Sequence, residues 1–325
     1  MAEPAILSTG KYLPRRVLSN HDLEQMVDTS DEWITTRTGI KERRIAAEDE
    51  SCSDLAYNAA RAALDRVGFD AGDLDLIVVA TLTPDYVMPS TACLLQARLG
   101  AERAGAADVY AACTGFIYGL AFASGLVANG TIRHALVVGS EVLSRFTDYT
   151  DRNTCVLFGD GAGAALLGPS EGRRVLVDFR LRADGTGADK LMIPAGGSLR
   201  PPSEETVRER LHYIKMEGRE IFKFAVTKLA WLCEEAARAQ GVSTREIRVV
   251  PHQVNYRIVK AAGERIDISP EQFFLNLERY GNTSGASIPV ALDEAIEEGF
   301  MKEGDIVVLP GFGGGLTYGY ATVRW

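Results

Sequence analysis

Short apolar runs alternate with helical segments along the chain. Residues 74–81 (LDLIVVAT) and 135–139 are β-branched runs typical of buried strands. Residues 53–67 are alanine-rich with helical spacing and end at Gly68. Residues 115–129 carry apolar side chains on every face, so we expect a fully buried helix there. This alternation of strand and helix predicts an α/β protein.

The second half of the sequence repeats this order. A helix is predicted over residues 222–240, stopped by Gly241, and is followed by a strand over 247–250. A second helix and strand are predicted over 284–298 and 306–309. Corresponding positions in the two halves lie about 170 residues apart as far as Val137 and Val307, which indicates an internal duplication.

The duplication predicts an N-terminal half, residues 1–170, and a C-terminal half, residues 171–325. The offset later falls to 154 residues, which places extra residues of the first half near 140–157. Residues 170–215 are rich in glycine, proline and charge. We expect surface loops or an inserted hairpin there, linking the halves and covering a site.

Composition excludes several classes of protein. With 46% apolar residues the chain can bury a large core, and its net charge of −9 disfavours a dedicated nucleic-acid binder. Residues 109–132 carry no charge over a length that could span a bilayer, but their glycines and polar residues favour a buried strand end and helix. No signal peptide is recognisable, and five cysteines without a C-x-x-C pair suit a reducing compartment. We therefore expect a cytoplasmic protein.

Three residues are candidates for chemistry. Cys113 (VYAACTGFIYGL) lies at a strand-to-helix turn, where the helix N-terminus stabilises a thiolate; the alternative is an inert core cysteine. His252 (VVPHQVNYRI) follows a strand end, and a structural histidine is equally compatible. Asn282 (YGNTSGASIP) occupies the turn equivalent to that of Cys113, although a helix cap is the alternative. In a pseudo-twofold structure these turns converge on one site.

Two glycine-rich stretches lack the features of nucleotide-binding loops. Residues 158–168 and 311–319 have neither a G-K-[ST] ending nor the helix and acidic residue of a dinucleotide fingerprint. They predict tight turns before the final strands, whose backbone N–H groups are able to bind an oxyanion. Since the sequence also shows no metal-ligand spacing, we expect neither a metal nor a cofactor.

The motifs AACTGF, PHQVN and GNTSGASIP, in this order, resemble the β-ketoacyl-acyl-carrier-protein synthase III family. So do DTSDEWITTRTGIKERRI, DRNTCVLFGDGAGA, MEGREIFKFAV and FGGGLTYG, and together these motifs cover nearly the whole chain. The resemblance implies a thiolase fold, with duplicated βαβαβαββ halves in a five-layer αβαβα arrangement and a homodimer. It also implies decarboxylative condensation of a short acyl-CoA with malonyl-acyl carrier protein, which initiates type II fatty acid synthesis.

The resemblance further implies roles for individual residues. Cys113 would be the acyl-accepting nucleophile, His252 and Asn282 the pair that drives malonyl decarboxylation, and the N–H groups of Cys113 and Gly314 the oxyanion hole. Met88 would come from the partner subunit and close the acyl pocket. Residues implied to bind coenzyme A and its pantetheine arm are Trp33, Arg37, Thr38, Arg152, Gly218, Phe222 and Asn255. Residues implied to dock the acyl carrier protein are Lys223, Arg257 and Arg265.

The sequence departs from the family pattern at three positions. Val254 and Tyr256 stand where alanine and an aliphatic residue are common, and Glu264 replaces a frequent basic residue in the docking patch. One alternative function is a specialised relative that loads or transfers another acyl group in secondary metabolism. A non-catalytic scaffold is the other, and it is disfavoured because Cys113, His252 and Asn282 are all present.

Overall fold

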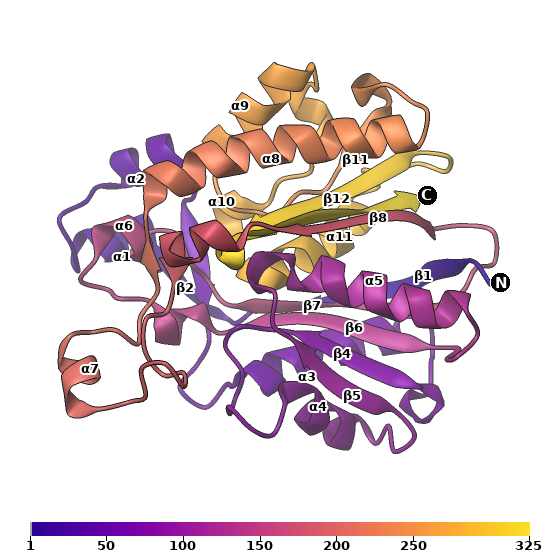
Figure 1. Cartoon of the computed structure of the whole chain (residues 1–325), viewed down its shortest axis with the longest axis horizontal. Coiled ribbons are helices and arrows are strands. Elements are labelled where there is room, and N and C mark those ends of the chain that lie inside the picture. Colours follow the sequence, from indigo (N-terminus) through magenta and orange to yellow (C-terminus); the bar gives the residue numbers. More distant parts are fainter. Residues whose placement is uncertain (1) are drawn as a thin grey trace.

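Helices and sheets alternate in five layers in the computed structural model, which describes residues 2–325 (Figure 1). The nine main strands form one unbroken series of hydrogen-bonded neighbours. The strands of the two halves pair with each other only at Ala5 and Val175. In the first half the order is β1 (Pro4–Tyr12), β7 (Gly161–Pro169), β6 (Ala135–Glu141), β4 (Leu76–Ala80) and β5 (Gly105–Val109). In the second half it is β8 (Val175–Ala183), β13 (Thr317–Arg324), β12 (Ile306–Gly313) and β11 (Ile247–Val249).

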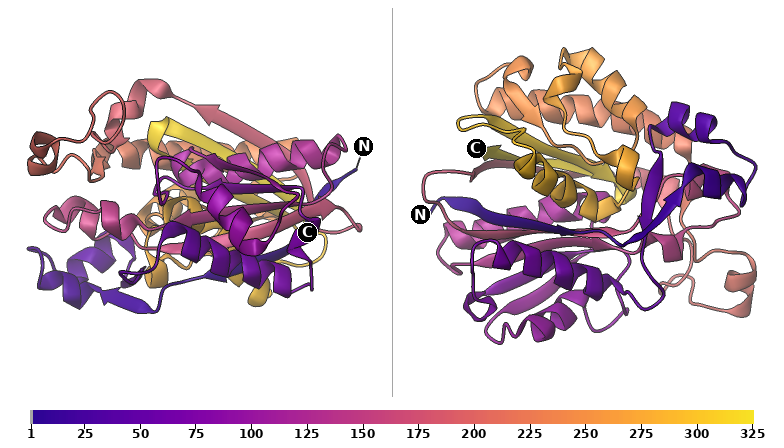
Figure 2. Two further views of the ribbon diagram at one scale, coloured as in Figure 1. Left: turned by 90° about the horizontal axis from the view of Figure 1, so that it is seen from below. Right: turned by 180° about the vertical axis from the view of Figure 1, so that it is seen from behind.

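The helices form the other three layers. Helices α5 (Gly115–Ala128) and α11 (Ser287–Glu297) lie between the two sets of strands and share one apolar core with both. Helices α3 (Cys52–Asp65) and α4 (Thr91–Leu99) cover the outer face of the first set. Helices α8 (Gly218–Ala239) and α9 (Tyr256–Ile266) cover the second (Figure 2). The predicted five-layer fold is confirmed.

The two halves repeat one order of elements. Strands β1, β4, β6 and β7 correspond in order to β8, β11, β12 and β13, and helices α3 and α5 correspond to α8 and α11. Both halves therefore place their strand-to-helix turns at the same end of the middle layer. The division predicted at residue 170 falls in the connection between β7 and β8.

The extra residues of the first half lie between β6 and β7. They include a short 3₁₀ turn, η3 (Leu143–Phe146), and helix α6 (Arg152–Cys155). These pack in one apolar cluster with the N-terminal segment that follows β1. That segment contains β2 (Arg16–Ser19), α1 (Asn20–Glu24), α2 (Asp31–Thr38) and β3 (Glu42–Ile45), and α10 (Leu277–Tyr280) packs beside it.

The expectation for residues 170–215 was wrong in part. Strand β8 belongs to the central sheet, and its alternating pattern VDFRLRA was a strand signal that the surrounding charge obscured. The rest does form loops, with a two-stranded hairpin of β9 (Leu191–Met192) and β10 (Lys215–Met216) and a projecting helix, α7 (Glu204–Arg208) (Figure 1). Helix α8 also begins four residues before its predicted start.

The helix expected to be fully buried has one open face. Phe122 of α5 is 50% exposed, and Tyr118 beside it is only partly covered. The uncharged stretch around this helix does not form a membrane span, because no helix within residues 2–325 is both long and apolar enough to cross a bilayer.

Candidate active site

Cys113 lies in a strained turn at the start of α5. The preceding residue, Ala112, has a left-handed backbone with φ of 46°. Gly313 lies directly against Cys113 and has to be a glycine, because a Cβ added to it would lie 2.9 Å from both the backbone nitrogen and the Cβ of Cys113. The close approach of Gly313 brings the glycine-rich turn of the second half directly against the thiol.

A pocket of about 350 Å³ opens at Cys113. Backbone-rich segments of both halves form its floor, including Ala112, Ser284, Gly314 and Gly315. Its walls are mainly apolar side chains: Leu82, Tyr110, Leu143, Phe158, Leu191, Met192, Ile193 and Ile214. An apolar pocket with few polar groups around one nucleophile is suited to a short acyl chain.

Burial opposes the expected thiolate at Cys113 in the free protein. Burial raises the pKa of the Cys113 thiol to about 12, the neighbouring Ser284 hydroxyl lowers it, and the negative charge of Glu141 raises it further. Burial thus favours the protonated thiol at Cys113 and opposes the stabilisation of a thiolate by the α5 N-terminus.

His252 is a neutral imidazole held in one orientation. Its backbone N–H donates to Pro310 O (2.9 Å), its ring packs edge-on against Phe312, and burial lowers its pKa to about 3. Its Nδ1 lies 2.6 Å from Ser287 Oγ. The Ser287 oxygen accepts the N–H of Gln253, and among the described residues its own proton has no acceptor other than Nδ1, so we assign that proton to the bond with Nδ1. The ring proton is thereby assigned to Nε2, which becomes a hydrogen-bond donor.

Asn282 lies on the turn between α10 and the 3₁₀ turn η7 (Ser284–Ala286). Its backbone is fixed by hydrogen bonds with Leu157 and Gly159. Its side-chain oxygen accepts the N–H of Ser284 at 2.8 Å. This bond orients the carboxamide, so its NH₂ group is the part left to donate to a ligand.

The turns that carry these residues converge. The turn of Cys113, η2 (Ala112–Thr114), contacts η7 beside Asn282 and η8 (Gly314–Leu316), which follows β12. His252 reaches the same region through Phe312, the neighbour of Gly313. The hydroxyl of Thr317 donates towards the carbonyl oxygens of Ala111 and Gly314, tying the nucleophile turn to the glycine turn. The duplication thus places groups from both halves around one thiol.

Three residues implied to bind coenzyme A lie together. The guanidinium groups of Arg152 and Arg37 lie 4.9 and 5.7 Å from the ring centroid of Trp33. Arg152 also donates to the backbone oxygen of Asp28. Two cations on one partly exposed indole form a surface that suits an anionic ligand with an aromatic ring.

Thr38 does not share that surface. Its side chain is buried, and its hydroxyl donates to Ile34 O and accepts the N–H of Ile40. Both bonds fix the C-terminal end of α2. This geometry argues against a direct contact between the Thr38 hydroxyl and a ligand, since the hydroxyl is already satisfied within the fold.

The remaining residues implied to bind the pantetheine arm or the carrier protein lie on α8 and α9. Gly218 begins α8, and Phe222 of that helix lies beneath the guanidinium of Arg257, 5.7 Å from ring centroid to Cζ. Asn255 caps α9 by accepting the N–H of Arg257.

The basic residues implied for docking do not form a purely positive patch. Lys223 is exposed but pairs with Glu220 at 3.1 Å, and Arg265 is exposed on the last turn of α9. Glu264 lines a shallow hollow beside Arg257, so the departure from the family pattern lies within the surface itself.

Met88 does not line the Cys113 pocket of its own protomer. It is 86% exposed, and its neighbours Tyr86 and Val87 are exposed as well. Tyr110, a wall of the pocket, is also exposed on this side of the protomer. Three of these exposed side chains lie on the loop before α4, and Tyr110 directly follows the edge strand β5.

Sequence reasoning missed three polar residues at the site. Ser287 orients His252, Ser284 lies at the thiol, and Glu141 is a fully buried carboxyl at the end of β6. The GNTSGASIP motif contained the two serines and was the available signal for them. No local signal marked Glu141, because its partners are distant in sequence.

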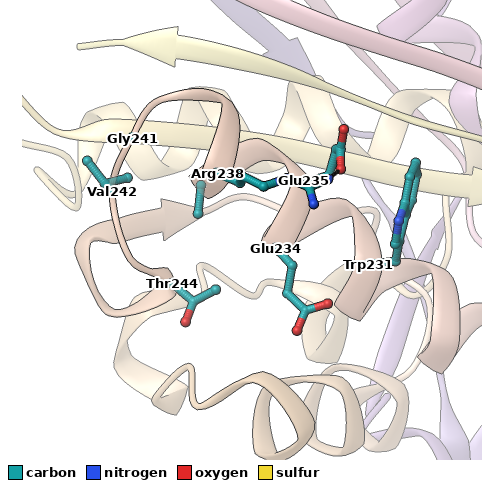
Figure 3. A pocket seen from close by; sticks show the side chains of 8 residues that line it. Trp231, Glu234, Glu235, Arg238, Gly241, Val242 and Thr244 are labelled. Carbon is teal, nitrogen blue, oxygen red and sulfur yellow. Dashed lines mark ion pairs between the residues drawn. The ribbon is translucent and has the colours of Figure 1, made fainter.

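A second, larger hollow of about 620 Å³ lies at the C-terminal end of α8 (Figure 3). It is lined by Trp231, Glu234, an ion pair between Glu235 and Arg238, and small residues after the helix. This lining includes no nucleophile, so we assign it no chemistry. Within residues 2–325 no group of histidine, cysteine and acidic side chains has the arrangement of a metal site.

Comparison with known proteins identifies the family. Residues 107–185 match the model of 3-oxoacyl-[acyl-carrier-protein] synthase III, and residues 237–325 match the model of its C-terminal part. The chain is 54% identical to the β-ketoacyl-[acyl-carrier-protein] synthase III of Natranaerobius thermophilus, over 100% of both chains.

Solved structures agree. The synthase III of Aquifex aeolicus has 46% identity and a TM-score of 0.91, and the match covers 99% of this chain and 100% of that one. The priming β-ketosynthase of the R1128 polyketide pathway has 35% identity and a TM-score of 0.90, covering 99% and 96%. The protein therefore belongs to the β-ketoacyl-[acyl-carrier-protein] synthase III family of condensing enzymes.

Proposed function

We propose that the protein condenses a short acyl-CoA with malonyl-acyl carrier protein, and that Cys113, His252 and Asn282 carry out this reaction. The product is a β-ketoacyl-acyl carrier protein, the first intermediate of type II fatty acid synthesis. The observation that carries the proposal is a cysteine thiol at an apolar pocket, on a turn that contacts the turn beside an oriented asparagine, with a buried neutral histidine packed on the neighbour of Gly313. Family membership supports it.

Acylation is the first step. The sulfur of Cys113 attacks the carbonyl carbon of the acyl-CoA, and the thiol proton leaves with the departing coenzyme A as its free thiol. The tetrahedral oxyanion is stabilised by the N–H groups of Cys113 and Gly314, on the two turns that meet at the pocket. Since burial raises the pKa of the Cys113 thiol, we infer that the thiol loses its proton as the sulfur attacks.

Condensation is the second step. Malonyl-acyl carrier protein loses carbon dioxide, and the electrons of the broken C–C bond form a thioester enolate. The Nε2–H of His252 and the NH₂ group of Asn282 donate hydrogen bonds to the enolate oxygen. A neutral histidine suits this role. Its low pKa keeps the imidazole uncharged, and the Nε2–H of a neutral imidazole donates a hydrogen bond to the enolate oxygen but is too weak an acid to give up its proton. The enolate carbon then attacks the carbonyl carbon of the acyl-Cys113 thioester, and the C–S bond breaks to release a Cys113 thiolate, which takes a proton from solvent to restore the thiol.

Binding surfaces follow from the same proposal. Trp33, Arg37 and Arg152 contact the nucleotide end of coenzyme A, and Gly218, Phe222 and Asn255 border the pantetheine arm. Lys223, Arg257 and Arg265 contact the acidic carrier protein. The active form is a cytoplasmic homodimer without a bound cofactor, in which Met88 of each subunit reaches the partner's acyl pocket.

The test is a reconstituted condensation with separate readouts for each step. Purified protein receives acetyl-CoA and malonyl-acyl carrier protein, and the β-ketoacyl product and released carbon dioxide are quantified. We expect Cys113→Ala to abolish condensation, while His252→Ala and Asn282→Ala lose decarboxylation by about 10²–10³-fold each and retain acylation of Cys113. Wild-type condensation by either of the last two variants would refute their roles.

A specialised relative that loads another primer is the second candidate. The similarity to a priming β-ketosynthase and the slim, flexible Met88 favour it over an enzyme restricted to acetyl-CoA. A panel of acyl-CoA primers separates the two, because only the specialised enzyme discriminates against acetyl-CoA.

A further inference from the structure

Glu141 is a buried carboxyl that the proposed chemistry does not use. It ends β6 with 0% of its surface exposed. On one side its carboxylate accepts the hydroxyls of Thr81 (3.2 Å) and Thr83 (2.7 Å) and the N–H of Leu82 (3.1 Å). On the other side the N–H of Gly285 points to it at 3.4 Å. The carboxylate therefore joins the segment after β4 to the turn after Asn282.

All of these donors are neutral. None of the ion pairs within residues 2–325 involves Glu141, so no cation offsets the loss of hydration. The titratable groups that face it are Cys52 on α3, Tyr110 after β5, and Cys113. Burial accordingly raises its pKa to about 7. Burying a carboxylate without a cation partner is unfavourable for folding, so we infer that Glu141 has a role at the active site.

The turn that Glu141 holds lies against the nucleophile. Gly139 of β6 packs on it so closely that an added Cβ would lie 2.2 Å from Gly285 O. Ser284 has a left-handed backbone with φ of 46°, lines the pocket of Cys113, and orients Asn282 through its N–H. Its hydroxyl lowers the pKa of both the Cys113 thiol and the Glu141 carboxyl, and a Cβ added to the next residue, Gly285, would lie 3.4 Å from Glu141 Oε1 and 3.5 Å from Ala112 O, the residue before Cys113.

We propose that Glu141 is a positioning residue that holds the turn of Ser284 and Gly285 against Cys113, and that its negative charge disfavours a thiolate on Cys113 before substrate binds. The hydrogen bonds to Leu82 and Thr83 anchor the carboxylate, and Gly285 is the group that it positions. Loss of this anchor displaces Asn282, so decarboxylation suffers. Loss of the charge removes a repulsion, so the thiol ionises more readily. The proposal rests on the function proposed above for these residues.

The two effects have opposite signs and are measured separately in Glu141→Gln. Alkylation of Cys113 by iodoacetamide, followed by peptide mass spectrometry across pH 6–10, reports ionisation of the thiol. Release of carbon dioxide from malonyl-acyl carrier protein reports the position of Asn282. We expect alkylation at least threefold faster at pH 8, and decarboxylation at least tenfold slower. Asp108→Asn is the matched control, because Asp108 is a partly buried carboxyl that accepts the N–H groups of Thr91 and Ala92.

The opposite signs exclude a purely structural effect. A folded Glu141→Gln variant in which both rates fall, or in which neither changes, overturns the proposal. If that variant does not fold, Thr83→Val takes its place: it removes the shortest bond to Glu141 and keeps the carboxyl, which remains ionised at the upper end of the pH range. It should slow decarboxylation without speeding alkylation, and unchanged decarboxylation overturns the positioning role. If the wild type itself releases no carbon dioxide, the proposed function fails, while alkylation still tests the charge effect.

Discussion

The tautomer of His252 depends on a single hydroxyl, that of Ser287. The chain Gln253 N–H to Ser287 Oγ to His252 Nδ1 leaves Nε2 protonated, which is the donor that an enolate needs. Burial alone would keep the ring neutral but would not select between its two nitrogens. Ser287 therefore determines which ring nitrogen of His252 carries the proton.

Replacing Ser287 by alanine should lower decarboxylation more than acylation. The variant keeps both proposed donors, so the loss should be smaller than the roughly 10²–10³-fold cost of removing one donor. Malonyl decarboxylation and Cys113 acylation rates, measured on the same preparation, check this. Equal slowing of both steps would show that Ser287 acts only on folding.

Glu141 also predicts how stability varies with pH. Its pKa is about 7 in the folded protein and near 4.5 in the unfolded chain, so its ionisation opposes folding. Its favourable contribution is present below about pH 4.5 and is lost as pH rises through 7. A shift of this size corresponds to about 3 kcal/mol. Denaturant unfolding at pH 5 and pH 8 should therefore show a smaller decrease in unfolding free energy for Glu141→Gln than for the wild type.

The candidate residues were predictable to the extent that local motifs mark them. Cys113 and His252 follow strand ends, Asn282 follows the short helix α10, and all three sit in distinctive motifs. Glu141 and the proton state of Cys113 were not predictable, because both depend on burial between segments far apart in the sequence. The pattern around Cys113 indicated a helix N-terminus and gave no measure of how deeply the thiol lies.

At the scale of elements, prediction succeeded where apolar runs were uninterrupted. Strands β4 and β6 and helix α3 lie within one or two residues of their predicted bounds. Strand β8 was missed because the charged residues Asp178, Arg180 and Arg182 alternate with apolar residues along its second half, as its partly exposed face permits. The open face of α5 was missed because a helix that is apolar on all sides gives no sign of which side remains uncovered in one protomer.

The short helix α2 presents the proposed nucleotide surface, and Trp33→Ala tests it. Loss of the indole removes the ring that Arg37 and Arg152 flank, so we expect KM for acyl-CoA to rise several-fold with kcat nearly unchanged. Trp231→Ala, in the hollow at the far end of α8, is the control and should leave KM unaltered (Figure 3). A fall in kcat alone for Trp33→Ala would place this residue outside substrate binding.

At the scale of the whole molecule, exposed apolar side chains near the edge strand β5 predict a dimer. Met88, Val87 and Tyr110 leave a surface beside the edge strand β5 that a stable monomer would not expose. Sedimentation at micromolar concentration should show a dimer, and a monomer would contradict the proposed composite pocket.

Met88 should set the length of the primer. Because methionine is flexible, acetyl-CoA and short branched or butyryl primers should be accepted, and chains beyond about ten carbons should be poor. Met88→Phe should narrow the range towards acetyl, and Met88→Ala should broaden it. Competition between mixed acyl-CoA primers measures this, and an unchanged product ratio in both variants would remove Met88 from the pocket.

The central claim is that Cys113 carries the acyl group between two reactions. Intact-protein and peptide mass spectrometry after incubation with a panel of acyl-CoA thioesters tests it most directly. The account predicts one acyl group per chain, located on Cys113, which disappears when malonyl-acyl carrier protein is added and reappears in the β-ketoacyl product. An acyl group on another residue, or no adduct with any acyl-CoA, would contradict it.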